Sequence, residues 1–285
     1  MKPGKVSATC FAALVVALSL AACTPRETPA PQVPVTGGNV PPMPPLPAAQ
    51  AQVEAAALEG AAIEAQQHGA NALLVVRNSH VIFERYWHGT TFSTPIGAGA
   101  WQGVIDDLLA GALVEDRKPL HGDATPDRAA IARAAGVTYE AYLAKRLWRP
   151  IGAFDAVLAP RLRAAQGDWL RIGELLANDG VYLGEEIVRP GWTRQVLERH
   201  AVAGAAPPSP ATKDLYHLPG ADGASLWVVP SLRLVILRTG GEIGAGDGRG
   251  DARIPELVLR GVMDRPRPTA GGEGTPDPAI FVPAH

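Results

Sequence analysis

Residues 72–86 read ALLVVRNSHVIFERY. Two runs rich in β-branched and aromatic residues, 72–77 and 80–86, flank Asn78-Ser79, a pattern typical of a β-hairpin. A second pair of such runs, 226–229 and 232–238, flanks Pro230-Ser231 near the other end of the chain. The two hairpins predict an antiparallel sheet assembled from both ends of the chain.

Helical patterns lie before, between and after the two hairpins. Apolar residues recur at helical spacing, with breakers such as Pro and Gly near several of the segment ends. The predicted helices are 48–67, 101–116, 138–147, 169–178 with Asp168 as its N-cap, and 255–263. This order lacks the strand–helix alternation of a doubly wound parallel sheet. It predicts an α/β fold of the α+β kind, with an antiparallel sheet flanked by helices.

The first 23 residues have the pattern of an export signal. Residues 1–22 carry Lys2 and Lys5, an apolar run and small residues at the end. The run is too short for a membrane span, which takes about 20 apolar residues. Leu20-Ala21-Ala22-Cys23 resembles the bacterial lipobox, which implies lipid attachment at Cys23 and a place in the cell envelope, on the periplasmic face of the outer membrane. The alternative is an ordinary signal peptide with a coincidental cysteine.

The regions at both ends of the remaining chain are poor in large apolar residues. Residues 23–47 are rich in proline and predict an extended tether. Residues 264–285 are rich in Pro, Gly and Thr and predict a disordered tail. The folded domain is therefore expected at 48–263.

Composition excludes several classes of function. The formal net charge is −2 with no basic cluster, which argues against a nucleic-acid partner. Cys10 and Cys23 are the only cysteines, so the folded part has no internal disulfide and no cysteine-ligated zinc. The histidines lack metal-ligand spacing, and we expect neither a metal nor a cofactor.

Several runs, taken in order, resemble the beta-lactamase-related serine hydrolases, a superfamily that includes penicillin-binding proteins, class C beta-lactamases and 6-aminohexanoate-dimer hydrolases. They span most of residues 70–240. The runs are 72–77 with 81–86, 111–116, 136–143, 146–153, 168–180 and 226–240. The resemblance implies a serine beta-lactamase/transpeptidase-like fold and hydrolysis of an amide, lactam or ester through a serine acyl-enzyme.

The catalytic residues of that family are missing. Its chemistry needs a serine nucleophile and, one helical turn later, a lysine that takes the hydroxyl proton. None of Lys118, Lys145 and Lys213 has a serine three residues before it. Family spacing back from 111–116 places the serine position at Ala100 and the lysine position at Gly103. We therefore predict no catalytic residue at these positions.

The chain is also shortened. No asparagine has tyrosine or serine two residues before it, so the family's second motif is absent. Only about a dozen residues connect Asp116 to Arg128, where a longer helical insert is expected. This predicts a reduced helical subdomain.

A few residues remain as candidates for a site. Ser225 is the least unfavourable alternative nucleophile. His217 is one place from the position where a His-x-Gly pattern needs histidine, so it should point to the opposite face of its strand. The run 238–240, Arg-Thr-Gly, imitates the family's Lys-Thr-Gly but ends the wrong strand. A vestigial cleft is expected at Trp101, Gly220 and Gly223.

These observations predict a lipid-anchored envelope protein with a degenerate serine hydrolase-like domain that is catalytically inactive and acts by binding. Its partner would be an envelope protein or a peptidoglycan-like ligand. One alternative is an active amide or ester hydrolase with a relocated nucleophile. Another is a purely structural role.

Overall fold

The computed structural model describes residues 31–120, 126–202, 212, 214–241 and 249–264, without the side chains of 249–251. The predicted signal peptide, Cys23 and all but the first residue of the predicted tail lie outside this range. No helix among the described residues is long and apolar enough to cross a membrane.

The main sheet joins strands from both ends of the chain, as the two hairpins predict. Its order is β3-β2-β11-β10-β9, and every pair is antiparallel. The strands are β2 (Ala72–Arg77), β3 (His80–Tyr86), β9 (Tyr216–Pro219), β10 (Ser225–Val229) and β11 (Leu234–Thr239). A single turn of 3-10 helix, η2 (Pro230–Leu232), connects β10 to β11.

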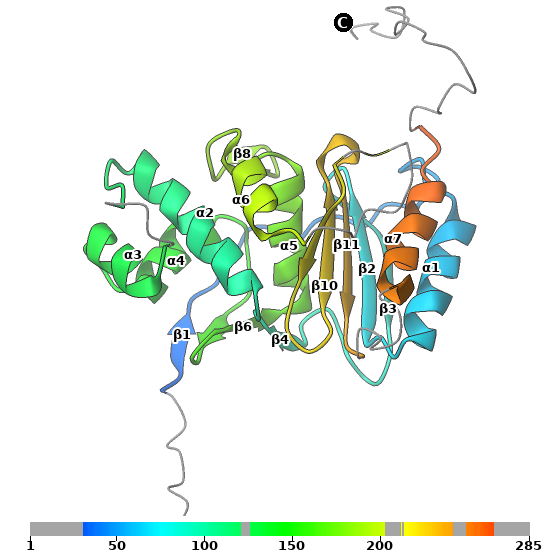
Figure 1. The fold of residues 1–285 in the computed structure, drawn as a ribbon, viewed down its shortest axis with the longest axis horizontal. Coiled ribbons are helices and arrows are strands. Elements are labelled where there is room, and N and C mark those ends of the chain that lie inside the picture. The colour runs from blue at the N-terminus through cyan, green and yellow to red at the C-terminus, as the bar shows by residue number, and fades with distance from the viewer. Residues whose placement is uncertain (1–30, 121–125, 203–211, 213, 242–248, 265–285) are drawn as a thin grey trace, which may run out of the picture. The chain divides into compact units, whose positions relative to one another are not determined.

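Helices cover both faces of this sheet (Figure 1). α1 (Ala55–Gln67) and α7 (Arg249–Arg260) lie on one face. α5 (Gln166–Ala177) lies on the other, with α2 (Trp101–Glu115) and α6 (Trp192–His200) beyond it. Successive side chains of a strand point to opposite faces, so Trp227 packs towards α1 and α7 while Leu226 and Val228 pack towards α5.

The proline-rich segment corrects the predicted domain boundary. Residues 31–47, expected to be a tether, pack on the domain. β1 (Val33–Val35) pairs with β5 (Ala156–Leu158), and Val35 and Met43 are buried. Further on, the backbone of 44–46 bonds to both polar groups of Val81 at the edge of β3. The extended conformation that proline favours suits pairing at a strand edge, and a few apolar residues supply the burial.

The remaining strands and helices form the smaller part beside α2. β5 and β1 belong to a second sheet of order β1-β5-β6-β4. Its other strands are β4 (Pro95–Gly97) and β6 (Leu162–Ala165), and the nearby helices are α3 (Arg128–Ala135), α4 (Tyr139–Leu143) and the π-helical turn η1 (Ala144–Trp148). A short hairpin, β7 (Val181–Tyr182) with β8 (Glu185–Glu186), follows α5.

Three predicted details differ from the structure. The first helix begins at Ala55 rather than 48, because residues 48–52 form turns. Asp168 is the third residue of α5 and not its N-cap: Ala165 takes that position, and its N–H donates to Asp168 Oδ2 at 3.1 Å. Asp264, assigned to the tail, pairs with the buried Arg77 at 2.6 Å.

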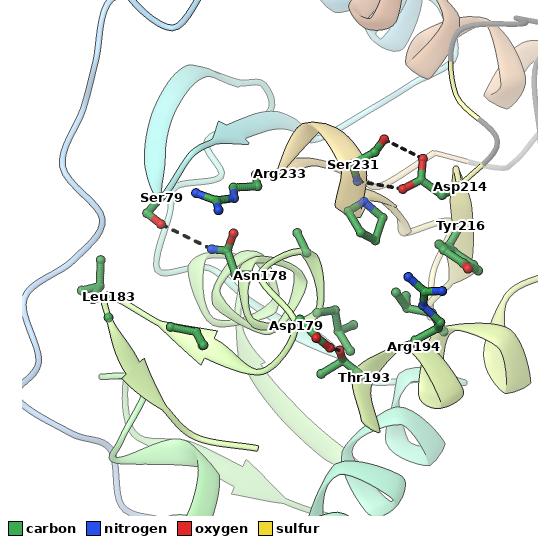
Figure 2. A pocket seen from close by; sticks show the side chains of 16 residues that line it. Ser79, Asn178, Asp179, Leu183, Thr193, Arg194, Asp214, Tyr216, Ser231 and Arg233 are labelled. Carbon is green, nitrogen blue, oxygen red and sulfur yellow. Dashed lines mark hydrogen bonds between the residues drawn. The ribbon is translucent and has the colours of Figure 1, made fainter. Parts of the chain in front are cut away.

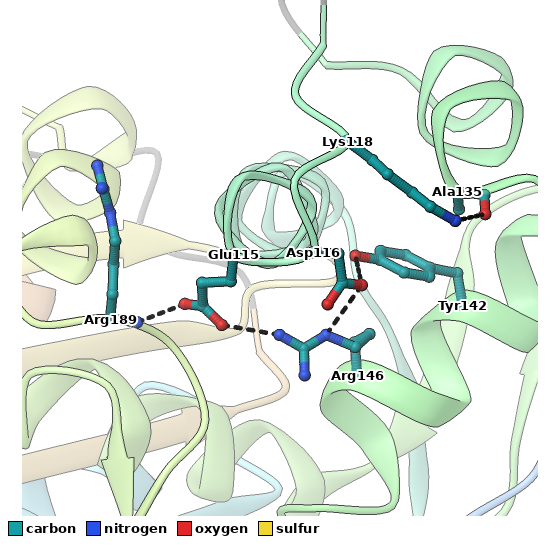
Figure 3. A network of polar contacts seen from close by, with 7 residues as sticks. All are labelled: Glu115, Asp116, Lys118, Ala135, Tyr142, Arg146 and Arg189. Atoms are coloured by element: carbon teal, nitrogen blue, oxygen red, sulfur yellow. Dashed lines mark hydrogen bonds and ion pairs between the residues drawn. The ribbon is translucent and has the colours of Figure 1, made fainter.

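A polar network fastens the end of α2 (Figure 3). Glu115 accepts a hydrogen bond from the Arg146 guanidinium and another from the N–H of Arg189, each 2.7 Å long. Asp116 accepts a hydrogen bond from Tyr142 at 2.9 Å and lies 3.5 Å from Arg146 Nε. These contacts join α2 directly to α4 and η1.

Candidate functional site

The serine and lysine positions of the resemblance lie at the start of α2. Ala100 is exposed and immediately precedes the helix. Gly103 lies one turn further on, and the ring of His200 from α6 takes the space beside it. A Cβ added at Gly103 would be 2.8 Å from Cε1 of His200. The space beside the predicted lysine position is thus occupied by a side chain of another helix.

The same close approach recurs two turns along α2. A Cβ at Gly111 would be 2.5 Å from Trp192 Nε1, and Trp192 precedes His200 by two turns of α6. Between the two glycines, Asp107 Oδ2 accepts hydrogen bonds from His200 Nε2 and from the Arg199 guanidinium, each 2.7 Å long. Asp107 is 1% exposed. Gly103 and Gly111 therefore let α6 pack tightly on α2.

The predicted vestigial cleft is closed by direct contacts. Trp101 Nε1 donates to the carbonyl of Leu218 at 2.9 Å, and a Cβ at Gly220 would lie 2.6 Å from the Trp101 indole. Gly99 has φ +54° and lies so close to Ala221 that any side chain would collide with that backbone. The β9–β10 loop thus rests on the first turn of α2. Gly223 lies elsewhere, with its carbonyl bonded to Arg238 at 2.7 Å.

His217 and Ser225 lie side by side, which sequence analysis did not foresee. His217 Nε2 is 3.1 Å from Ser225 Oγ, and the histidine ring stacks on Trp227 with centroids 5.0 Å apart. The pair lies on the sheet face that packs towards α1 and α7, opposite the face where Leu218 meets α2. Ser225 is 0% exposed and His217 is 8% exposed. Pairing the strands around the 220–224 turn would have revealed this proximity.

The Arg-Thr-Gly run has bonds within the scaffold. Arg238 donates to the carbonyls of Gly223 and His68, each at 2.7 Å. Thr239 Oγ1 donates to the buried Gln166 Oε1 at 2.6 Å. These contacts join the end of β11 to α1 and α5.

Buried carboxyl groups flank α2 and α5. Burial raises the pKa of Asp106 despite hydrogen bonds from Tyr139 and Gln102. Burial also raises the pKa of Asp168 to about 6, opposed by the Phe154 N–H and by Arg171, which lies 2.8 Å away. Both carboxyl groups are bonded to other residues of the protein, so we interpret their role as structural.

An open cavity of about 830 Å³ lies at the other end of the sheet (Figure 2). Its walls come from the β2–β3 turn, the end of α5, the β7–β8 hairpin, the first turns of α6, the start of β9 and the η2 turn. The polar lining residues are Ser79, Asn178, Asp179, Thr193, Arg194, Asp214, Tyr216, Ser231 and Arg233. This cavity could not be predicted from the sequence, because each segment contributes only one to four ordinary residues.

Among the described residues, no group of three or more His, Cys, Asp or Glu side chains is placed to hold a metal ion. Cys23, the predicted lipid-attachment residue, lies outside the described residues.

Comparisons with known proteins identify the fold. No family model and no curated protein matches the sequence. A protein described as a 6-aminohexanoate-dimer hydrolase from Bacillus anthracis has 14% identity and a TM-score of 0.62, over 81% of this chain and 90% of its own. A protein described as a beta-lactamase from Bacteroides dorei has 14% identity and a TM-score of 0.56, over 74% and 99%. EstCE1, a hydrolase with promiscuous acyltransferase activity, has 13% identity and a TM-score of 0.53, over 74% and 99%.

At 13–14% identity, these neighbours show that the chain has a fold similar to that of beta-lactamase-like hydrolases. The predicted resemblance and the predicted fold class, an antiparallel sheet flanked by helices, are confirmed.

Proposed function

We propose that this chain is a cell-envelope lipoprotein whose serine hydrolase-like domain is catalytically inactive and acts by binding. The observation that carries the proposal is the close packing of His200 on Gly103, the predicted position of the family's lysine. A Cβ added at Gly103 would be 2.8 Å from Cε1 of His200. Loss of nucleophile and base together lowers a hydrolase rate by about a million-fold. Here the base is absent and its space is filled.

Covalent labelling tests the inactivity. The full-length chain is incubated separately with a fluorophosphonate and with a fluorescent penicillin, and its intact mass is measured. We expect no adduct with either reagent, because Ala100 has no hydroxyl and Gly103 has no amine. A stoichiometric adduct would overturn the proposal, and peptide mapping would identify the nucleophile.

One observation favours a second candidate, an amide or ester hydrolase with Ser225 as a relocated nucleophile. His217 Nε2 lies 3.1 Å from Ser225 Oγ, within reach of the hydroxyl proton. The full burial of Ser225 counts against attack on a substrate. An adduct on Ser225 that is lost in Ser225→Ala, but kept in Ser231→Ala, would establish this alternative.

The lipid anchor rests on the lipobox-like residues 20–23. Ten residues lead from Cys23 to Val33, where the chain joins the small sheet. They span at most about 36 Å when fully extended. The domain would therefore stay close to the periplasmic face of the outer membrane, where an envelope protein or a peptidoglycan-like ligand would be its partner.

Fractionation tests the anchor. The unaltered chain should incorporate labelled fatty acid and sediment with outer membranes, whereas Cys23→Ser should do neither. Incorporation of fatty acid by Cys23→Ser would overturn this part of the proposal.

A further inference from the structure

We propose that the cavity between α5, α6 and the β10–β11 turn binds a small molecule with two separated carboxylates, such as a short acidic peptide. This inference rests on the proposed function in one respect, namely that the ligand is bound and not cleaved. The cavity has about 830 Å³, within the range of pockets that enclose small ligands.

The carboxylates in the lining are already bonded to the protein. Asp179 Oδ1 accepts hydrogen bonds from the Gly191 N–H and from Thr193 Oγ1, each 2.8 Å long. Asp214 accepts hydrogen bonds from the N–H and the hydroxyl of Ser231, each 2.7 Å long. These bonds leave the two acids as rim contacts that hold α6 and the η2 turn in place.

The two cationic residues of the lining, Arg194 and Arg233, differ from these acids. The guanidinium groups of Arg194 and Arg233 make no hydrogen bond and no salt bridge with any residue that the structure describes. Figure 2 shows them on opposite sides of the cavity, Arg233 beside Ser79 and Asn178, and Arg194 beside Tyr216. A guanidinium presents a planar fork of donors that fits a carboxylate, so the cavity offers one carboxylate position on each side.

Other charges near the cavity leave these positions open. Glu174 is near enough to Arg233 for their charges to interact, but it is fully buried and its Oε1 accepts a hydrogen bond from Asn178 Nδ2. Burial raises the pKa of this carboxyl, and this favours the neutral form, which forms no ion pair with Arg233. Glu198 lies on the exposed side of α6, near Tyr216 and Arg194.

The backbone fixes Arg233 towards the cavity. Its φ is +43°, which is uncommon for a residue with a side chain. Two hydrogen bonds hold this turn: the Arg233 N–H donates to Pro230 O, and the Asn78 N–H donates to Arg233 O, both at 3.0 Å. Leu176, Val181 and Leu197 also line the cavity and provide apolar surface for a ligand.

Calorimetric titration of the full-length chain tests the proposal. The probes are N-acetylated peptide amides with two glutamates separated by zero to four alanines. Each has a counterpart with glutamines. We expect at least one glutamate spacing to bind about tenfold tighter than its glutamine counterpart, since each carboxylate contributes charge-assisted bonds.

Variants locate the binding. Arg194→Gln and Arg233→Gln should each weaken the preferred peptide about tenfold, while Arg133→Gln, on the exposed side of α3, should leave it unchanged. Both cavity arginines are exposed, so their melting temperatures should match the unaltered chain. The proposal is overturned if no glutamate peptide exceeds its counterpart, or if the arginine variants bind as well as the unaltered chain.

Inorganic phosphate tests whether the cavity binds a single anion instead of two carboxylates. If phosphate displaces the peptide and binds as tightly, the two-carboxylate ligand is wrong. Peptide mass is followed during each titration: cleavage would overturn the proposed inactivity, whereas loss of binding alone would overturn only this inference.

Discussion

The two ends of β9 and α6 differ in how tightly they are packed. At one end, β9 finishes against Trp101, and the last residue of α6, His200, packs on Gly103. At the other end, the start of β9 and the first turns of α6 border an open cavity of about 830 Å³. The end with the predicted serine and lysine positions, Ala100 and Gly103, is closed, and the end that borders the cavity is open.

The difference lies in what separates the elements. At the closed end, glycines bring the backbone of α2 and of the β9–β10 loop against aromatic rings. At the open end, Asp179 bonds to Thr193 of α6, and Asp214 bonds to Ser231 of the η2 turn.

The largest expected effect comes from rebuilding the lysine. Gly103→Lys should lower the free energy of unfolding by about 3 kcal/mol, because the side chain must displace the His200 ring. Gly103→Ala should lower it by a smaller amount. Gly60→Ala is the matched control: it lies inside α1 with open space around it, and alanine there should stabilise by about 1 kcal/mol.

Urea unfolding of the three variants measures these changes in the free energy of unfolding. Adding His200→Ala to Gly103→Lys should recover part of the loss. If Gly103→Lys were as stable as the unaltered chain, the closed end would be loosely packed and the comparison would fail.

Gly103 shows what the sequence alone can and cannot predict. The spacing of the family that residues 111–116 resemble predicts that Gly103 stands at the lysine position, because the two lie in the same short segment. Its contact with His200 joins two helices far apart in sequence, and no periodicity predicts which ring lies beside which glycine. The hairpins, by contrast, follow from local β-branched runs and turn residues, and both were predicted within a few residues.

The proline-rich segment and the cavity were missed for different reasons. Residues 31–47 have the composition of a tether, and only tertiary pairing with β5 and β3 reveals their place in the fold. The cavity exists because six segments converge, and none of them carries a motif. The pairing of His217 with Ser225 was accessible in principle, since it requires only the register of one hairpin.

The second prediction compares the two ends of β9. Trp101→Phe should cost about 2 kcal/mol, because it removes the bond to Leu218 O and part of a buried indole. Tyr216→Phe, at the open end of the strand, should change stability by less than about 0.5 kcal/mol, because the phenol bonds to no described residue. Equal losses in thermal unfolding would show that the two ends are packed alike.

The third prediction concerns pH. Burial raises the pKa of Glu174, so the folded chain binds a proton that the unfolded chain releases. The cost of ionising it is absent below the unfolded pKa and grows as pH rises towards the folded pKa. Glu174→Gln should therefore stabilise by about 1 kcal/mol at pH 7.5, because the neutral amide has no charge to bury, and should have no effect near pH 4.

Denaturation midpoints at four pH values from 4 to 7.5 measure this effect. Asp168, with a pKa of about 6, adds a decline in stability with rising pH that both proteins share. A stabilisation by Glu174→Gln that persists unchanged at pH 4 would show that burial of charge is not its cause.

The smallest expected effect is that of Ala100→Ser. The residue is exposed and precedes α2 with φ −71° and ψ −20°, so a hydroxyl there gains no N-cap bond and meets no obstruction. Stability should change by less than about 0.5 kcal/mol. No adduct should form with a fluorophosphonate, because without an amine at Gly103 nothing takes the hydroxyl proton. Intact mass measures both this variant and the triple variant Ala100→Ser, Gly103→Lys, His200→Ala. Labelling of the triple variant alone would show that repacking by α6 is what keeps the closed end inactive, whereas labelling of Ala100→Ser itself would mean that the base survives elsewhere.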